Sequence, residues 1–311
     1  MRHAVVIGAL AALLAAGFGV HTSRAAFTAH DTFTATVSTA ADWVAPAVTL
    51  TTPADDSYAK TTSITLSGAA GNATGDSTTV TLDVYSGSAA TGTPVLTRSV
   101  ARSGSTWSTS VTTLGQGTYT AQATQADAGG NTGKSATRTF TIDTTAPTRV
   151  SIAAANGAGT PAQVDEGDAI TFTYSEPMLA SSILSGWTGT SAATVDVRFF
   201  SGTNDAFTVL DSSGAANVKL DAGTTGGGGV SLASGSYVKN TVNFTATLTQ
   251  SADRRSFVVT LGSPDNASRL QTTPVPARNM VWTPKAGPTD LAGNALASTA
   301  TYTETDSDQD F

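Results

Sequence analysis

The stretch Asp143-Thr144-Thr145-Ala146-Pro147 separates two regions of the chain that share one hydrophobic pattern. Before it, apolar and polar residues alternate in short runs such as Val80-Thr81-Leu82-Asp83-Val84. After it, the alternation returns in longer runs such as Ile170-Thr171-Phe172-Thr173-Tyr174. A period of two puts successive side chains on opposite faces of a β-strand. Both regions are therefore predicted to be built from strands.

The first region, residues 46–143, has about seven such runs, separated by turn-forming segments, within roughly a hundred residues. That number and spacing of strands is typical of an immunoglobulin-like β-sandwich. Tyr119 lies where such sandwiches place a tyrosine that bonds back to the backbone, two residues before a core position usually held by cysteine. Ala121 is at that core position, and the whole chain has no cysteine, so the predicted domain would hold without a disulfide.

The second region, residues 144–303, is predicted to be a larger all-β sandwich with insertions. The apolar runs around Phe244 and Phe257 flank the turn Ser251–Arg255 and predict a hairpin. One short helix is expected within Met178–Trp187. The segment Asp221–Gly229 is rich in glycine and is expected to be a mobile loop. Because it lacks the Gly-Lys-Ser/Thr ending of a phosphate-binding loop, nucleotide binding is not expected there. The order of strands in this region is beyond single-sequence reasoning.

The N-terminus has the three parts of a secretory signal peptide. A basic start at Arg2 and His3 is followed by the uncharged apolar run Ala4–Val20 and by small residues suited to cleavage after Ala25. This pattern predicts a signal peptide at residues 1–25. The alternative is an uncleaved membrane anchor, although the run is short and rich in Ala and Gly for a membrane span.

Two further segments complete the expected organisation. Residues 26–45 are predicted to form a short strand and a linker, and residues 304–311 are predicted to form an acidic tail. No second apolar run follows the first, so the mature chain is expected not to span a membrane. The protein is therefore expected to be secreted or displayed on the cell surface.

Composition excludes several classes of function. The net charge is −7 and no cluster of Lys and Arg occurs, so nucleic-acid binding is not expected. The histidines, His3, His21 and His30, all precede the first predicted domain. A Ser-His-Asp triad, a thiolate nucleophile and a His- or Cys-ligated metal are therefore excluded from both domains. The chain is predicted not to be an enzyme; only hydrolysis by paired carboxylates is left open.

A family resemblance rests on several segments of the first region. Pro46–Pro53, Asp83–Gly87, Gly117–Tyr119, Asp127–Asn131 and Asp143–Pro147 together resemble the tandem bacterial Ig-like repeats of exported surface and adhesin proteins. In the second region, Ser175–Met178 and Asp290–Asn294 resemble the Ig-like domains of surface-layer proteins. The resemblance implies an all-β protein with two immunoglobulin-like β-sandwich domains in tandem after an N-terminal signal peptide. It does not imply a particular partner, because such domains have many uses.

The motif Asp-x-x-Gly-Asn occurs in both regions, at Asp127–Asn131 and at Asp290–Asn294, each time just before the last predicted strand. One interpretation is a tight turn, in which Gly takes a positive φ and the Asp or Asn side chain caps backbone amides. The other interpretation is a calcium site, because Ca²⁺ is bound by six to eight oxygens from carboxylates, amides and backbone carbonyls.

The topology of a sandwich brings this motif together with other acidic residues. The loop before the last strand lies at the same pole as the entry of the chain and the loop after the second strand. In the second region this predicts a calcium site at Asp143, Glu176, Asp290 and Asn294, and in the first region at Asp76, Asp127 and Asn131, with Asp42 as a further candidate. The family resemblance implies the same, since some relatives bind calcium at such junctions.

Two other groups of residues have competing interpretations. Asp165, Glu166 and Asp168 share one loop and are expected to form a solvated turn, with a glycosidase carboxylate pair as the alternative. Of the tryptophans, Trp107 is assigned to the core and Trp43 to packing on the first domain, whereas Trp187 and Trp282 are ambiguous. Exposed and roughly coplanar aromatic rings would favour sugar binding.

The sequence therefore predicts a non-catalytic exported cell-surface or secreted Ig-like protein that serves adhesion, spacing or matrix interaction. Its partner would be a surface protein or a glycan, and the sequence does not name it. The alternative is a carbohydrate-binding accessory module of an extracellular system.

Overall fold

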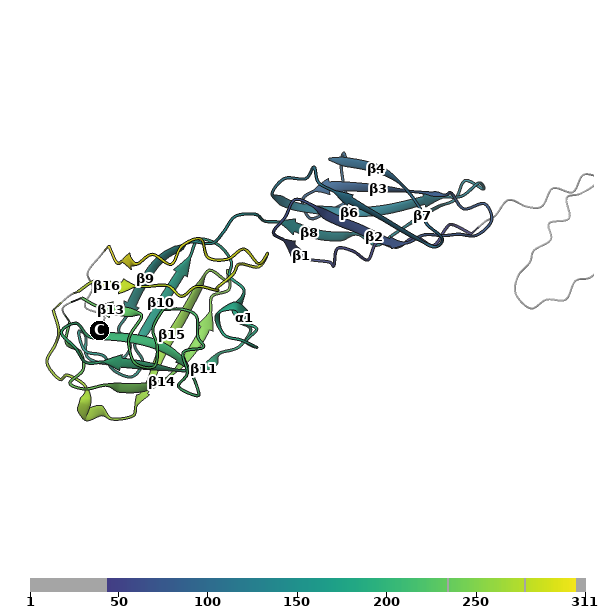
Figure 1. Cartoon of the computed structure of the whole chain (residues 1–311). Coiled ribbons are helices and arrows are strands. Elements are labelled where there is room, and N and C mark those ends of the chain that lie inside the picture. The colour runs from purple at the N-terminus through teal and green to yellow at the C-terminus, as the bar shows by residue number, and fades with distance from the viewer. Residues whose placement is uncertain (1–43, 234, 277, 306–311) are drawn as a thin grey trace, which may run out of the picture. The chain divides into compact units, whose positions relative to one another are not determined.

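The computed structural model describes residues 44–233, 235–276 and 278–305 (Figure 1). The predicted signal peptide at 1–25 and the predicted strand that follows it lie outside these residues. Within them, the helical elements are short: α1 (Ala180–Ile183) and the 3-10 helix η1 (Ala267–Arg269). All the remaining elements are strands. The all-β prediction is confirmed.

The first region folds into a large and a small sheet. In the described chain, a six-stranded sheet has the order β1-β8-β6-β3-β4, with β7 paired to β6, and a separate two-stranded sheet pairs β2 with β5. The bounds are β1 (Ser57–Ala59), β2 (Ile64–Ala69), β3 (Thr79–Ser86), β4 (Leu96–Ala101), β5 (Thr106–Val111), β6 (Gly117–Ala126), β7 (Thr132–Lys134) and β8 (Arg138–Ile142).

The core of the first region lies between these sheets. Val80, Leu82 and Val84 on β3 are fully buried, as the alternating pattern predicts. From β5, Trp107 is buried too, and its Nε1 donates to the backbone oxygens of Thr49 (3.0 Å) and Ala69 (3.1 Å). The segment around Val48 and Leu50, where apolar residues alternate with Thr, is not a regular strand, although Thr49 N donates to Ala69 O at 3.0 Å.

The predicted tyrosine contact is present. The Tyr119 hydroxyl donates to Gly115 O at 3.1 Å, and the Tyr119 ring stacks on Phe140 with centroids 5.9 Å apart. Ala121, at the position where cysteine is usual, is fully buried. A small side chain there lets the hydrophobic core close without a disulfide.

The second region is one continuous antiparallel sheet. Its strands, among the described residues, follow the order β17-β16-β13-β12-β11-β14-β15-β10-β9. The bounds are β9 (Arg149–Ala155), β10 (Ala169–Tyr174), β11 (Ala193–Phe200), β12 (Ala206–Asp211), β13 (Val230–Leu232), β14 (Val242–Gln250), β15 (Ser256–Pro264), β16 (Met280–Trp282) and β17 (Tyr302–Thr303).

This sheet curves until its two ends enclose a common core. β16, near one end of the strand order, contacts β9 at the other end. The Trp282 ring meets Phe172 and Tyr174 edge-on, with centroids 5.2 and 5.6 Å apart, and its Nε1 donates to Leu220 O at 2.8 Å. The aromatic cluster thus joins strands that are distant in the sequence.

Two segments of the second region differ from expectation. Asp221 is buried at the start of the glycine-rich segment, where its carboxylate accepts from Thr208 Oγ1 (2.6 Å), Val209 N (2.9 Å) and Gly223 N (2.8 Å). This segment is therefore anchored to β12, which contradicts the mobile-loop expectation. Glu304, expected in a loose tail, is buried and accepts from Met280 N at 3.0 Å; residues 306–311 lie outside the described chain.

Other local expectations agree with the structure. The turn Ser251–Arg255 joins β14 to β15, with Arg254 at φ 60°, and a helix is present within 178–187 as α1. In the part of the chain that is described, no helix has the length and apolar character needed to cross a membrane.

Candidate metal centre

Both copies of the Asp-x-x-Gly-Asn motif form the same turn. In each copy the Asn backbone N donates to Asp Oδ1 at 2.8 Å and the Asn Nδ2 donates to Asp Oδ2 at 2.8 Å, for Asp127–Asn131 and for Asp290–Asn294. The glycines have matching φ values, 90° at Gly130 and 87° at Gly293. Because Gly adopts this conformation without a steric penalty, the tight-turn interpretation is confirmed for both copies.

Among the described residues, the second copy gathers two further carboxylates close enough to share an ion. Asp143 follows β8, Glu176 follows β10, and Asp290 lies between β16 and β17. One carboxylate oxygen from each of these residues lies within 4.8 Å of the others. The structure thus brings together the three acidic residues that the sequence analysis placed at one pole of the second region.

Asn294 positions this cluster through its amide nitrogen. Its Nδ2 donates to the backbone oxygen of Asp143 and to Asp290 Oδ2, both at 2.8 Å. Asn294 therefore holds the two acidic residues side by side through its amide nitrogen, and its expected role as a ligand through the amide oxygen stays a prediction. The Asp290 side chain is nearly fully buried, at 1% exposure.

The electrostatics of the cluster favour a positive ion. Burial and the neighbouring charges of Asp143 and Asp290 raise the pKa of Glu176 to about 7, and Arg255 opposes the rise only in part. Like charges that converge in a partly buried site disfavour one another's ionised forms. A bound cation would reverse this effect, because it would stabilise all three carboxylates as anions.

The donors available are oxygens, which suits a hard cation. Three carboxylates can supply three or more of the six to eight oxygens that Ca²⁺ takes, and backbone carbonyls and water can supply the rest. Asp143, Glu176 and Asp290 would hold such an ion. These oxygen donors suit calcium, and calcium binding itself stays a prediction.

The corresponding residues of the first region are less suited to hold a metal ion. Asp76 and Asp127 are paired across an isolated backbone bridge, but Asp76 Oδ2 already accepts from Ala73 N at 2.9 Å. The hydrogen bond from the Asn131 side chain is the main cause that lowers the pKa of Asp127. In the described chain, the acidic group large enough to hold a metal is the one at Asp143; Asp42 lies outside the described residues.

The other acidic loop is structural. Asp168 is fully buried, and its two carboxylate oxygens accept from Gly157 N (2.9 Å) and Asp165 N (2.8 Å). Burial is the main cause that raises the pKa of Asp168 to about 6. Asp165 Oδ2 in turn accepts from Thr160 N at 2.9 Å. The expectation of a solvated turn is therefore wrong for Asp168, which ties together the connection between β9 and β10.

The described tryptophans belong to the interior. Trp107, Trp187 and Trp282 are 2%, 7% and 0% exposed. Trp43 lies outside the described residues. The ambiguous residues Trp187 and Trp282 are thus assigned to packing, and no pair of described tryptophans forms an exposed platform for a sugar ring.

The sequence analysis overlooked a polar group on the outer face of the second region. Asp196 and Arg198 on β11 lie beside Thr245 and Asn243 on β14. The signal was present in the sequence, because the outward positions of β11 carry charges where those of the neighbouring strand β14 carry mostly Thr. These residues line a depression on the outer face of the second region.

Comparisons with known proteins give distant structural likenesses. No protein-family model matches the chain, and no curated protein matches it either. The fibronectin(III)-like modules of CbhA from Clostridium thermocellum align at 10% identity and a TM-score of 0.25, covering 70% of this chain and 90% of theirs. A titin fragment aligns at 9% identity and a TM-score of 0.21, covering 85% of this chain and 97% of its own.

Dimeric latent PorU from Porphyromonas gingivalis is also similar, at 14% identity and a TM-score of 0.23. The alignment covers 71% of this chain but only 20% of PorU. The strand pairing described above establishes the all-β fold independently of these likenesses.

Proposed function

We propose that the chain is a non-catalytic, exported cell-surface or secreted Ig-like protein that serves adhesion, spacing or matrix interaction, with calcium bound at the connecting segment. The observation that carries the proposal is the convergence of Asp143, Glu176 and Asp290 within 4.8 Å. Asp143 belongs to the segment that links the two strand-rich regions, so an ion there would act on the connection between them.

The backbone of this segment supports the proposal. Asp143 N donates to Ala59 O at 2.9 Å, and Asp143 O accepts from Asn294 Nδ2 at 2.8 Å. Farther along, Pro147 O accepts from Ala297 N at 2.8 Å. Calcium would add bonds from three loops to these contacts and would restrict the segment further. A restricted connection suits a spacer, which has to hold its ends apart.

Several features support an exported, non-catalytic role. The predicted signal peptide at 1–25 supports export, and the segments resembling tandem bacterial Ig-like repeats support a place at the cell surface. The chain has no cysteine and no histidine after His30, so both regions lack a thiolate nucleophile and an imidazole base. Buried or hydrogen-bonded acidic residues such as Asp168, Asp205 and Asp221 serve to anchor loops.

The carbohydrate-binding alternative was expected to rest on exposed aromatic rings. The described tryptophans are buried, so a stacking platform is not its support. A polar depression on the second region favours it instead.

Calcium binding is tested by thermal unfolding of residues 26–311 in EDTA, in Mg²⁺ and in Ca²⁺. A ligand that binds only the folded state stabilises it by about 2.7 kcal/mol at a hundred times its dissociation constant. We expect Ca²⁺ to raise the melting temperature of the wild-type chain and of Glu166→Gln, a control outside the cluster, but not that of Glu176→Gln. A wild-type chain that melts identically in EDTA and Ca²⁺ would contradict the proposal.

A further inference from the structure

A polar depression lies on the outer face of the second region, away from the acidic cluster. It has a volume of about 580 Å³ and is lined mainly by polar side chains, among them Asp196, Arg198, Asn243, Thr245, Ser263 and Asp265. Its size is within the range of small-molecule sites. A smaller hollow of about 230 Å³ shares Thr245 with it and is lined by further threonines of the same face.

The strand register explains why polar groups gather here. On β11, Val195, Val197 and Phe199 are fully buried, so Asp196 and Arg198 face outward. Asp196 is paired with Thr245, and Arg198 with Asn243, on the neighbouring strand β14. Gly262 on β15 keeps the hollow open, because a Cβ at this position would lie 2.9 Å from Thr245 Oγ1.

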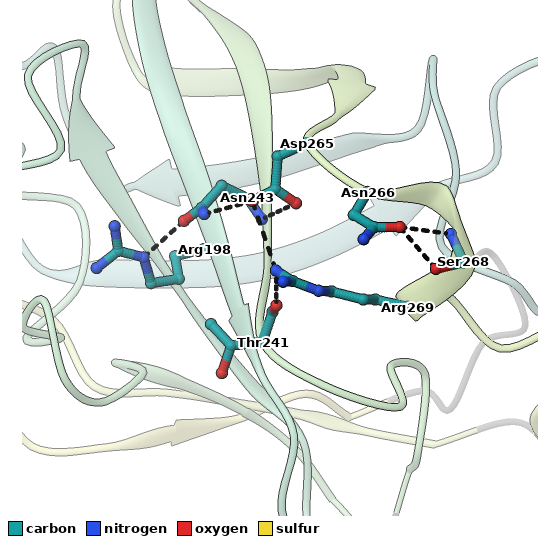
Figure 2. A network of polar contacts seen from close by, with 7 residues as sticks. All are labelled: Arg198, Thr241, Asn243, Asp265, Asn266, Ser268 and Arg269. Carbon is teal, nitrogen blue, oxygen red and sulfur yellow. Dashed lines mark hydrogen bonds and ion pairs between the residues drawn. The ribbon is translucent and has the colours of Figure 1, made fainter.

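A chain of hydrogen bonds connects residues that line the depression, and Figure 2 shows these contacts. Arg198 Nε donates to Asn243 Oδ1 at 2.6 Å, and Asn243 Nδ2 donates to Asp265 Oδ2 at 2.9 Å. Arg269 Nη1 lies 3.7 Å from Asp265 Oδ2 and donates to Thr241 O at 2.9 Å. Arg198 Nη1 donates to Thr225 O at 2.8 Å. The guanidinium and the amide are therefore oriented before any ligand arrives.

Two groups in the depression are left for a ligand. Among the described residues, neither the Asp196 carboxylate nor Arg198 Nη2 has a hydrogen-bond partner. They are on the same face of β11, two residues apart, and thus offer an acceptor and a donor side by side. A ligand that uses both must donate to a carboxylate and accept from a guanidinium.

The charges in the depression restrict the class of ligand further. An anion at Arg198 would meet the negative charges of Asp196 and Asp265, and a cation at Asp196 would meet Arg198. An apolar ligand would leave the polar lining without hydrogen bonds. Neighbouring hydroxyl groups both donate and accept without carrying charge. We propose that this depression binds a neutral saccharide through Asp196 and Arg198, with Asn243 holding the guanidinium in place.

This site is independent of the calcium proposal and adds the contact that an adhesive or matrix-binding surface requires. No aromatic ring lines the depression, so binding rests on hydrogen bonds at a partly exposed surface. We therefore expect weak binding of a single sugar unit, in fast exchange, with tighter binding of longer chains.

The test is a titration of the isotope-labelled full chain, followed by NMR. The probes are methyl glucoside, methyl mannoside, methyl galactoside, methyl xyloside and N-acetylglucosamine, each raised to tens of millimolar. We expect at least one of them to shift the amide signals of Asp196, Arg198, Asn243 and Thr245. If none shifts these signals, or if shifts are spread evenly over the surface, the proposal is overturned.

A matched pair of variants shows whether the saccharide-dependent shifts arise from binding at Asp196. Asp196→Ala removes the free acceptor and is expected to abolish the saccharide-dependent shifts. Asp83→Ala removes an outward-facing aspartate from β3, whose carboxylate accepts from Thr97 Oγ1 (2.6 Å). We expect this variant to leave the saccharide-dependent shifts unchanged. Retained binding in Asp196→Ala would overturn the assignment.

Charged probes separate a saccharide site from an anion site. Inorganic phosphate and methyl glucuronide carry negative charge, so we expect them to bind more weakly than the neutral sugars. If either binds more tightly, and Asp196→Ala strengthens that binding, the depression is an anion site and the neutral-saccharide proposal is wrong.

Discussion

At the scale of single residues, the Asp-x-x-Gly-Asn motif forms the same turn twice, and one of the two turns lies beside further carboxylates. Asp127 and Asp290 make the same hydrogen bonds with Asn131 and Asn294, so the motif by itself explains a turn and nothing more. The difference lies in residues distant in the sequence, because Asp143 and Glu176 reach only Asp290. A short motif therefore predicts a metal site only where the fold brings further ligand residues next to it.

The raised pKa of Glu176 predicts a pH dependence of stability. The folded-state pKa of about 7 is above the ordinary value of 4.5, so the folded chain binds this proton more tightly than the unfolded chain. Without calcium, the free energy of unfolding should therefore fall as pH rises from about 4.5 to about 7. Calcium needs the ionised carboxylate, so its stabilising effect should grow over the same range.

Glu176→Gln tests this prediction at the same residue. Denaturant unfolding in EDTA at pH 5 and pH 8 is expected to show that the variant loses less stability than wild type with rising pH. Glu166→Gln serves as the comparison, since Glu166 lies outside the cluster and accepts from Ser263 Oγ at 2.9 Å. Equal pH slopes for wild type and Glu176→Gln would contradict the assignment.

Tyr119→Phe tests the tyrosine contact of the first region. The change removes the hydrogen bond from the hydroxyl to Gly115 O and keeps the ring that stacks on Phe140. One such bond contributes about 1 kcal/mol, so we expect a loss of that size in the free energy of unfolding, measured with denaturant. The response to calcium should not change. A calcium response altered by this variant would contradict the view that Tyr119 stabilises the first region independently of the acidic cluster.

At the scale of elements, buried acidic side chains hold loops against strands. Asp205 accepts from Tyr237 N (2.6 Å) and Val238 N (2.8 Å), and Asp221 does the same for the end of β12 and the segment that follows it. Each carboxylate bonds to several backbone N–H groups that would otherwise be buried without a partner. These residues explain how long connections can be ordered in the second region.

Asp221→Asn is expected to loosen the glycine-rich segment. The amide cannot accept at both positions, so either Val209 N or the Thr208 hydroxyl loses its acceptor. Hydrogen bonds to charged groups contribute about 1.5–3 kcal/mol, and we expect a loss of about 2 kcal/mol. Hydrogen exchange should rise in residues 221–229. Asp253→Asn, in an exposed turn, is the control and should change neither quantity.

At the scale of the whole molecule, the buried hydrophobic residues form two clusters. One cluster runs from Val48 to Ile142 and the other from Ile152 to Trp282. We predict that each is a separate unfolding unit. Leu82→Ala, which opens a cavity in the first cluster, should cost about 2–5 kcal/mol and lower only one of two calorimetric transitions. A single transition that shifts as a whole would contradict this division.

The sequence by itself determined the class of fold and the local turns. The period-two alternation is a property of neighbouring residues, so runs such as Val80–Val84 and Ile170–Tyr174 predict strands wherever they pair. Tyr119, the hairpin turn at Ser251–Arg255 and the two Asp-x-x-Gly-Asn turns are local in the same sense. Backbone sterics and side-chain bonds over a few residues specify them without knowledge of the partners.

Only the tertiary structure decided which strands pair and which side chains meet. The order of the nine described strands in the second region, the role of Asn294 as a holder of Asp143 and Asp290, and the burial of Asp168 all depend on contacts between distant residues. So does the depression at Asp196 and Arg198. The alternation of apolar and polar residues indicates which face of a strand is apolar. The register and the order of the strands are set by the packing of the whole core.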